Sequence, residues 1–84
     1  MVEVADSTLR SDRQVKTRIY ARAGLPDFWI VNLVDRVVEV HREPGLSSDA
    51  MGWSYRSVEV LMHSAAVIPL AAPGASIAVA DLLP

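Results

Sequence analysis

The stretch that decides the fold is Asp27–Arg42, which reads DFWIVNLVDRVVEVHR. Its first part, Asp27–Leu33, carries bulky and β-branched side chains without alternation, a pattern typical of a central strand that is covered on both faces. Its last part, Val37–Arg42, alternates valines with polar residues and predicts a second strand. The short connection between them makes the two strands a hairpin. We expect Phe28 and Trp29 in the core.

A helix is predicted ahead of the hairpin, over Asp12–Ala23. Ser11 is a suitable N-cap, and Gln14 lies three residues further on, which completes an S-x-x-Q capping box. Gly24 stands where many helices end in the left-handed conformation, and Pro26 follows it. The start and stop signals therefore agree on a single helix.

Two sets of residues recur at every fourth position along this helix. The first set is apolar and is expected to face the sheet: Val15, Ile19 and Ala23. The second set lies beside it: Asp12, Lys16 and Tyr20. Asp12 and Lys16 are spaced for an exposed ion pair, which would contribute only about 0.3–0.5 kcal/mol. Tyr20 also suits packing at the edge of a core, so a purely structural role for this second set stays open.

Shorter elements surround the helix and the hairpin. We expect further strands at Met1–Ala5, Trp53–His63, Val67–Leu70 and Ser76–Ala80, with a loop at Glu43–Gly52. This order of strand, helix, hairpin and further strands predicts a mixed α+β (α/β) fold, with a mixed β-sheet and one main helix. With 84 residues, the chain is expected to form a single domain over residues 1–84.

Composition excludes several classes of protein. A hydrophobic content of 51% and a mean hydropathy of +0.26 rule out a disordered tail. The absence of cysteine rules out disulfides and thiolate metal sites. The two isolated histidines, His41 and His63, are expected at the surface or on a strand face, and they do not suit a structural zinc site. The charge-free stretch 64–80 is broken by prolines and is short for a membrane span. We expect a cytoplasmic protein that does not contact membranes.

Charge is unevenly distributed along the chain. The net charge is −2, yet five of the eight basic residues fall within one segment: Arg10, Arg13, Lys16, Arg18 and Arg22. Such a run is often a solvated helix face, and it also suits a patch that faces phosphate groups. Glu3 stands in the apolar strand at the start of the chain. Because an unpaired buried carboxylate is costly, its side chain should reach solvent, a partner or a metal ion.

Several spaced motifs together resemble those of the Uma-type restriction endonucleases, in the PD-(D/E)XK nuclease superfamily. The family pattern has a Glu-Val strand, a D-x-x-x-K-x-x-x-Y helix, a G-(V/I)-x-E-Y-W-(L/I)-V-D segment and a V-x-V-(Y/H) strand. The corresponding parts here are Glu3-Val4, the set Asp12, Lys16 and Tyr20, the stretch Gly24–Asn32, Val38–His41 and the ending Ile77–Leu83. The resemblance spans nearly the whole chain, with its motifs in order.

The resemblance implies a restriction-endonuclease-like core and a metal-dependent endonuclease that cleaves DNA with Mg²⁺ or Mn²⁺. Glu3 would be a metal ligand together with the backbone carbonyl of Val4, because Mg²⁺ prefers oxygen ligands. Lys16 would orient the attacking water or stabilise the charge that develops on phosphorus. Asp12 and Tyr20 would hold Lys16 in place. The residues that would contact DNA phosphates are Arg10, Arg13 and Lys16.

The sequence also departs from the family pattern. Family members are longer, and their N-terminal half supplies early strands and the first metal-binding aspartate, so the resemblance covers the C-terminal portion of the fold. Ala5 stands where the superfamily has a lysine, and Asn32 and Phe28 stand where Asp and Tyr are common. Such an incomplete site predicts weak metal binding and slow cleavage. The alternative is a truncated, non-catalytic remnant, or an interaction module that forms a homo-oligomer through an open edge near Met1–Ala5.

Overall fold

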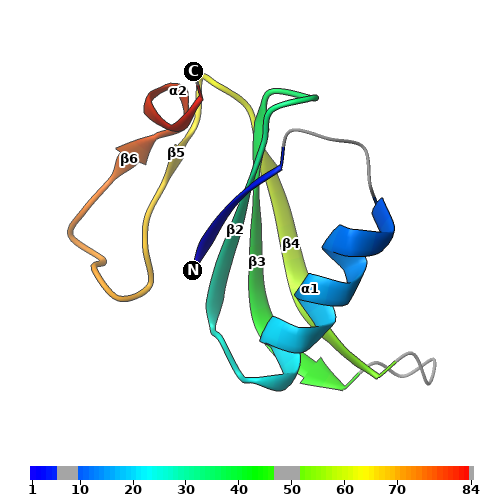
Figure 1. The fold of residues 1–84 in the computed structure, drawn as a ribbon. Coiled ribbons are helices and arrows are strands. Elements are labelled where there is room, and N and C mark those ends of the chain that lie inside the picture. Colours follow the sequence, from blue (N-terminus) through cyan, green and yellow to red (C-terminus); the bar gives the residue numbers. More distant parts are fainter. Residues whose placement is uncertain (6–9, 47–51, 84) are drawn as a thin grey trace.

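The computed structural model describes residues 1–5, 10–46 and 52–83, with helix side chains described from Gln14 onward. In chain order the elements are β1 (Val2–Ala5), α1 (Arg10–Arg22), β2 (Asp27–Asn32), β3 (Val37–Leu46), β4 (Trp53–Leu61), β5 (Ala66–Val67), β6 (Ile77–Ala78) and α2 (Val79–Leu82) (Figure 1). The expected mixed α+β architecture is confirmed, with a four-stranded mixed sheet, a short second sheet and one main helix.

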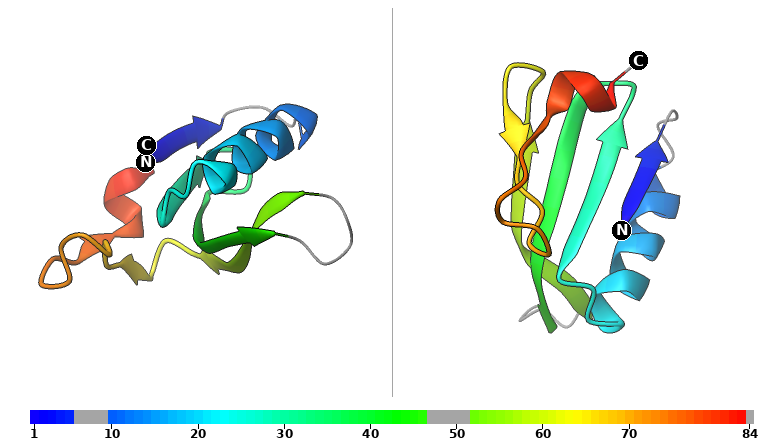
Figure 2. Two further views of the ribbon diagram at one scale, coloured as in Figure 1. Left: turned by 90° about the horizontal axis from the view of Figure 1, so that it is seen from below. Right: turned by 90° about the vertical axis from the view of Figure 1, so that its left-hand side faces the viewer.

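The larger sheet has the strand order β1-β2-β3-β4. β1 and β2 are parallel and are joined through α1, whereas β2 with β3 and β3 with β4 are antiparallel. α1 lies against one face of this sheet, and β5, β6 and α2 lie on the other side (Figures 1 and 2). β2 is therefore central and covered on both faces, as the sequence predicts.

Side chains of β2 point alternately into two cores. On the α1 side, Phe28 and Ile30 pack with Ala21 and Tyr55. On the other side the core consists of Trp29, Val31, Val38, Val40, Val67, Val79 and Leu83. Phe28 and Trp29 are 1% and 5% exposed, which confirms their predicted core positions.

α1 begins earlier than predicted and ends with the predicted glycine. Ser11 lies inside the helix, so it does not cap it, and the true N-cap falls outside the described residues. At the other end, the Leu25 N–H donates to the Tyr20 carbonyl and the Gly24 N–H donates to the Ala21 carbonyl. These are the bonds of a Schellman motif, and Gly24 takes the positive φ of 76° that this motif requires.

The helix packs through a different face from the one predicted. Val15 and Ile19 are 50% and 58% exposed, and Ala23 is exposed as well, so the expected apolar stripe points away from the sheet. Ala21 is fully buried instead, and Tyr20 is half-buried beside it. The reason is steric fit: the small Ala21 permits a close approach to the strands, while the Tyr20 ring fills the space next to the aromatic core.

β3 is longer than predicted and takes up the first part of the expected loop Glu43–Gly52. It continues to Leu46 through Pro44, although prolines are rare inside sheets. The last residue of β3 that pairs with β2 is Arg42. Beyond that point β3 has only β4 as a neighbour, and such an edge position is where a strand tolerates proline.

His41 lies on a face of β3, which is one of the two places expected for it. It is only 8% exposed, because its ring lies against the rings of Phe28 and Tyr55. One further expectation was wrong. The strand expected over Ser76–Ala80 ends at Ala78, where α2 begins. Val79 is fully buried in the core, which draws the chain into this short helical turn.

Candidate functional site

Glu3, Lys16 and Tyr20 converge on the α1 side of the sheet. The Tyr20 hydroxyl donates a hydrogen bond of 2.7 Å to Glu3 Oε1, and Lys16 Nζ lies 4.0 Å from Glu3 Oε2. The side chains of Lys16 and Glu3 are 47% and 31% exposed, so a solute can reach both charges. The approach of Lys16 to Glu3 is the one that their motif positions led us to expect.

The local structure explains this convergence. Glu3 alternates along β1 with two valines, and its register partner Ile30 points into the core beneath α1. β1 leads into α1, which returns the chain to the parallel strand β2 and lies on this face of the sheet, where it packs mainly against β4 and β3. Lys16 and Tyr20 are four residues apart, so both project from the same side of the helix.

Tyr20 is held in place by the core. Its ring packs edge-on against Phe28, with ring centroids 4.9 Å apart and an interplanar angle of 67°. The hydrogen bond to Glu3, followed by burial and the negative charge of Glu3, raises the pKa of the Tyr20 phenol above its usual value. The hydroxyl therefore keeps its proton and remains a donor. Tyr20 was expected to hold Lys16, and the described contact of its hydroxyl is the hydrogen bond that it donates to Glu3.

The backbone of Val4 faces the open edge of the sheet. The Trp29 N–H donates to the Met1 carbonyl, and the Leu33 N–H donates to the Ala5 carbonyl. In a parallel ladder a strand bonds to a given neighbour through every second residue, so the N–H and C=O groups of Val4 point away from β2. The Val4 carbonyl, expected as a metal ligand, is therefore not used by the ladder.

Three of the expected site residues have side chains outside the described part of the chain: Asp12, Arg10 and Arg13. Within the described part, no three His, Asp or Glu side chains lie close enough together to hold a metal ion. Glu3 Oε2 and the Val4 carbonyl are both oxygen donors, the kind that Mg²⁺ takes in proteins. These donors fit a magnesium ion in kind, but they are fewer than the protein ligands of a tight site.

A second polar cluster lies where the hairpin of β2 and β3 turns. Asn32 Nδ2 donates to Asp35 Oδ2 at 3.1 Å and to Glu39 Oε2 at 3.3 Å. Asn32 Oδ1 accepts from the N–H groups of Val34 and Asp35, at 3.1 and 3.0 Å. Glu39 Oε1 lies 3.3 Å from His41 Nε2. The amide of Asn32 thus closes the turn and also separates two carboxylates.

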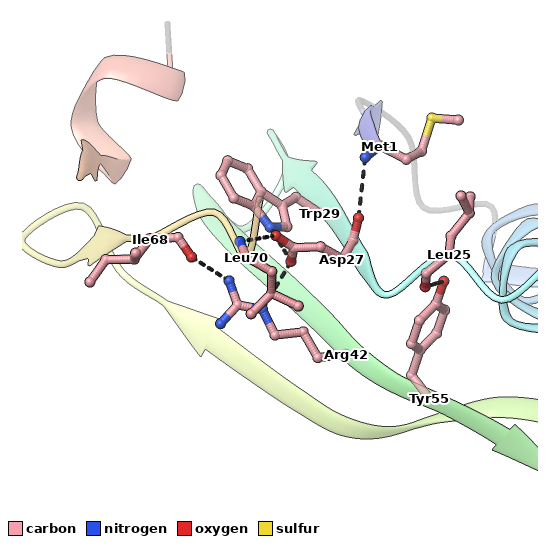
Figure 3. Close-up of polar contacts among 8 residues, drawn as sticks. All are labelled: Met1, Leu25, Asp27, Trp29, Arg42, Tyr55, Ile68 and Leu70. Atoms are coloured by element: carbon pink, nitrogen blue, oxygen red, sulfur yellow. Dashed lines mark hydrogen bonds and ion pairs between the residues drawn. The ribbon is translucent and has the colours of Figure 1, made fainter. Parts of the chain in front are cut away.

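Sequence analysis missed a third cluster, which is built around Asp27 (Figure 3). Asp27 Oδ1 accepts hydrogen bonds from Trp29 Nε1 at 2.7 Å and Arg42 Nε at 2.9 Å, while Oδ2 accepts from the Leu70 N–H at 3.0 Å. Arg42 also donates to the Ile68 carbonyl. The cluster fastens the segment after β5 to β2 and β3. Its one sequence signal was the i, i+2 spacing of Asp27 and Trp29 in a strand, because the other partners are remote along the chain.

The chain matches the family model of Uma2, described as "putative restriction endonuclease", over residues 1–80. The chain belongs to the Uma2 family. The match confirms the family that the spaced motifs indicated, and it makes this Uma2 protein nuclease-like. No curated protein and no solved structure shows a significant match to it. Among the described residues of this Uma2 chain, none form a helix with the length and apolar character needed to cross a membrane.

Proposed function

We propose that this Uma2 chain carries part of a metal-dependent nuclease site that hydrolyses phosphodiester bonds in DNA. The observation that carries the proposal is the convergence of Glu3, Lys16 and Tyr20 on one accessible side of the sheet. Cation-assisted hydrolysis of a phosphate needs a carboxylate for the cation and positive charge near the phosphate oxygens. Membership of a family of restriction-endonuclease type supports the same class of reaction.

Each residue has a distinct part in this proposal. Glu3 Oε2 and the Val4 carbonyl would hold Mg²⁺ or Mn²⁺. A bound cation would polarise the phosphate and lower the pKa of a coordinated water. Lys16 would orient the attacking water or stabilise the negative charge on the phosphate oxygens. Since Lys16 Nζ is already 4.0 Å from Glu3, its ammonium group also offsets the charge of the carboxylate before a cation arrives.

The direct test is a titration with Mg²⁺ and Mn²⁺ followed by a nuclease assay on plasmid DNA. We expect slow nicking that requires a high cation concentration, because the described residues offer a single carboxylate at this site. Glu3→Gln and Lys16→Met should each abolish nicking. Glu59→Gln removes an exposed carboxylate on β4 and should leave nicking unchanged. Nicking that survives Glu3→Gln would overturn the proposal.

α1 would supply the contacts to the DNA backbone. Arg18 and Arg22 are exposed, and Lys16 is exposed beside Glu3. At about 100° per residue, Lys16 and Arg18 project to nearly opposite flanks of the helix. Only some of the basic groups can therefore meet one DNA molecule at the same time, which favours weak binding through a few phosphates.

A second proposal concerns assembly: we propose that the chain forms a homo-oligomer through β1. β1 is an outer strand, and Val2 and Val4 are 50% and 63% exposed. It carries none of the lysines, prolines or bulges that protect strand edges, and its one charge, on Glu3, is held against α1. An antiparallel pair with Val4 facing Val4 of a second copy sets Glu3 opposite Ala5. The Glu3 carboxylates of the two copies are then not directly opposite each other, so the pair carries no like-charge repulsion at that position.

A further inference from the structure

We propose that Tyr20 is the positioning residue of the Glu3 carboxylate: it holds Oε1, and so presents Oε2 to Lys16 and to a cation. This inference rests on the proposed nuclease function, but it assigns Tyr20 a partner and a task that the motif spacing did not indicate. The spacing places Tyr20 beside Lys16, whereas the hydroxyl donates to Glu3.

The two oxygens of Glu3 have different surroundings. Oε1 accepts the Tyr20 hydroxyl at 2.7 Å, and Oε2 is the atom 4.0 Å from Lys16 Nζ. A hydrogen bond to a charged acceptor is short and directional, whereas an ion pair at 4.0 Å leaves room for a further ligand on the same oxygen. The carboxylate is therefore oriented for ligation through one oxygen.

The position of the Tyr20 hydroxyl is set by packing, whereas the side chain of Glu3 can adopt several rotamers. Tyr20 is anchored by its edge-on contact with Phe28 and by the fully buried Ala21 next to it in α1. Glu3 lies in a four-residue outer strand that has one neighbouring strand, and its side chain has three rotatable bonds. The bond to Tyr20 selects one rotamer of Glu3 out of several.

Loss of this bond should change cation binding without removing a ligand. In Tyr20→Phe the carboxylate is free to turn both oxygens toward Lys16 and to form a closer ion pair. A cation would then have to displace the ammonium group. Residues that orient a metal ligand typically alter metal affinity by about 10- to 100-fold when mutated, and we expect a rise in the dissociation constant of about tenfold for Mn²⁺.

The first experiment measures Mn²⁺ binding from the paramagnetic broadening of NMR amide signals of β1. Tyr20→Phe is compared with Tyr55→Phe, which also loses a part-buried phenol hydrogen bond, of 2.8 Å to the Leu25 carbonyl, away from Glu3. Tyr20→Phe should weaken Mn²⁺ binding about tenfold, and Tyr55→Phe should leave it unchanged. Equal effects of the two variants would mean a general structural role for Tyr20 and would overturn the proposal.

The second experiment requires neither metal nor nuclease activity. The chain has two tyrosines, so the ultraviolet resonance Raman signal of tyrosine in a Tyr55→Phe background reports Tyr20 alone, including whether its hydroxyl donates a hydrogen bond. Glu3→Ala removes the acceptor and should shift this signal to that of a phenol bonded to water, with circular dichroism confirming the fold. An unchanged signal would refute the link between Tyr20 and Glu3. A shifted signal without any Mn²⁺ binding in the unmodified chain would preserve that link and reject the nuclease proposal.

Discussion

Asn32 stands where the family pattern G-(V/I)-x-E-Y-W-(L/I)-V-D has its aspartate, and its contacts use both the oxygen and the nitrogen of the amide. Its Nδ2 donates to the carboxylates of Asp35 and Glu39, and its Oδ1 accepts two backbone N–H groups of the turn. The side chain is 5% exposed, so water cannot replace these partners. Only an amide combines a donor and an acceptor in this shape. A carboxylate would keep the turn contacts and lose the donor.

We predict that Asn32→Asp destabilises the protein by about 1–3 kcal/mol near neutral pH. The new carboxyl group would face Asp35 and Glu39, which raise its pKa in the folded state. A raised folded pKa gives stability that is present at low pH and is lost as pH rises, so the deficit should shrink on acidification. Urea unfolding at several pH values measures this. Adding Asp35→Asn should recover part of the loss at neutral pH, and a pH-independent deficit would contradict the explanation.

The contribution of Asp27 to stability depends on pH in the opposite direction from the one expected for an aspartate at position 32. Burial alone would raise its pKa, but the hydrogen bonds from Arg42, the Leu70 N–H and Trp29 outweigh burial and lower it. A lowered folded pKa gives stability that is present above the ordinary aspartate pKa and is lost as pH falls through the folded pKa. Asp27 therefore contributes most to the free energy of unfolding at neutral pH.

Asp27→Asn should therefore cost about 1–3 kcal/mol at neutral pH, and the difference from the unmodified protein should vanish in acid. Thermal unfolding across the pH range measures both effects. Asp81→Asn is the matched control, because Asp81 is an exposed carboxylate on α2. If Asp81→Asn destabilised the protein as much as Asp27→Asn, the Asp27 cluster would not be what fastens the segment after β5.

At the scale of the element, α1 separates what sequence can predict from what it cannot. The glycine stop was predictable, because a C′ glycine acts through its own φ angle. The buried face was not, because it depends on the shape of the sheet below. Val15 and Ile19 have the correct spacing for a core stripe, yet Ala21 with its small side chain occupies the contact.

Because α1 packs through Ala21 and exposes Ile19, we expect substitutions at these two positions to change stability in the opposite order from the one that the hydrophobic pattern predicts. Ala21→Leu should destabilise the protein by about 1–3 kcal/mol, because the added atoms overpack the contact with the sheet. Ile19→Ala, at a position 58% exposed, should change stability by less than about 0.5 kcal/mol. The urea concentrations at the unfolding midpoints of the two variants measure these two losses of stability. A larger loss for Ile19→Ala would show that α1 packs through the stripe after all.

The same helix sets the expected DNA affinity. Binding through two to four phosphates should be weak and independent of sequence, with a log–log salt slope of about −2 to −4. Reversing the charges of Arg13 and Lys16 should weaken binding more than reversing those of Arg36 and Arg56. Fluorescence anisotropy with labelled duplex DNA at several salt concentrations measures both. Binding that does not respond to salt would contradict a role for these charges.

At the scale of the molecule, patterns local in sequence were predictable and remote pairings were not. The central strand β2 followed from its continuous apolar run, and the approach of Glu3 to Lys16 followed from spaced motifs. The bonds from Asp27 to Arg42 and Leu70 join residues 15 and 43 positions apart, which no local pattern encodes. For the same reason the burial of His41 depends on aromatic partners from two other strands.

We predict that the whole molecule self-associates through β1. Val4→Lys should give a monomer, because a lysine on an outer strand opposes edge pairing. Val60→Lys is the matched control: Val60 is a comparably exposed valine, 59% against 63%, on the outer strand at the opposite end of the sheet. Sedimentation over a range of concentrations should show larger species for the unmodified chain and for Val60→Lys. A monomer at every concentration would refute edge pairing.

The outward-facing carbonyl of Val4 connects the two proposals through thermodynamic linkage. It would accept an N–H from a neighbouring copy in the assembled state and would face a cation in the separated state. Each event then raises the apparent dissociation constant of the other by the same factor. Dilute protein would bind the cation more readily, and concentrated protein would be paired and poorly loaded. The abundance of the chain would thus set how much of it is competent to act.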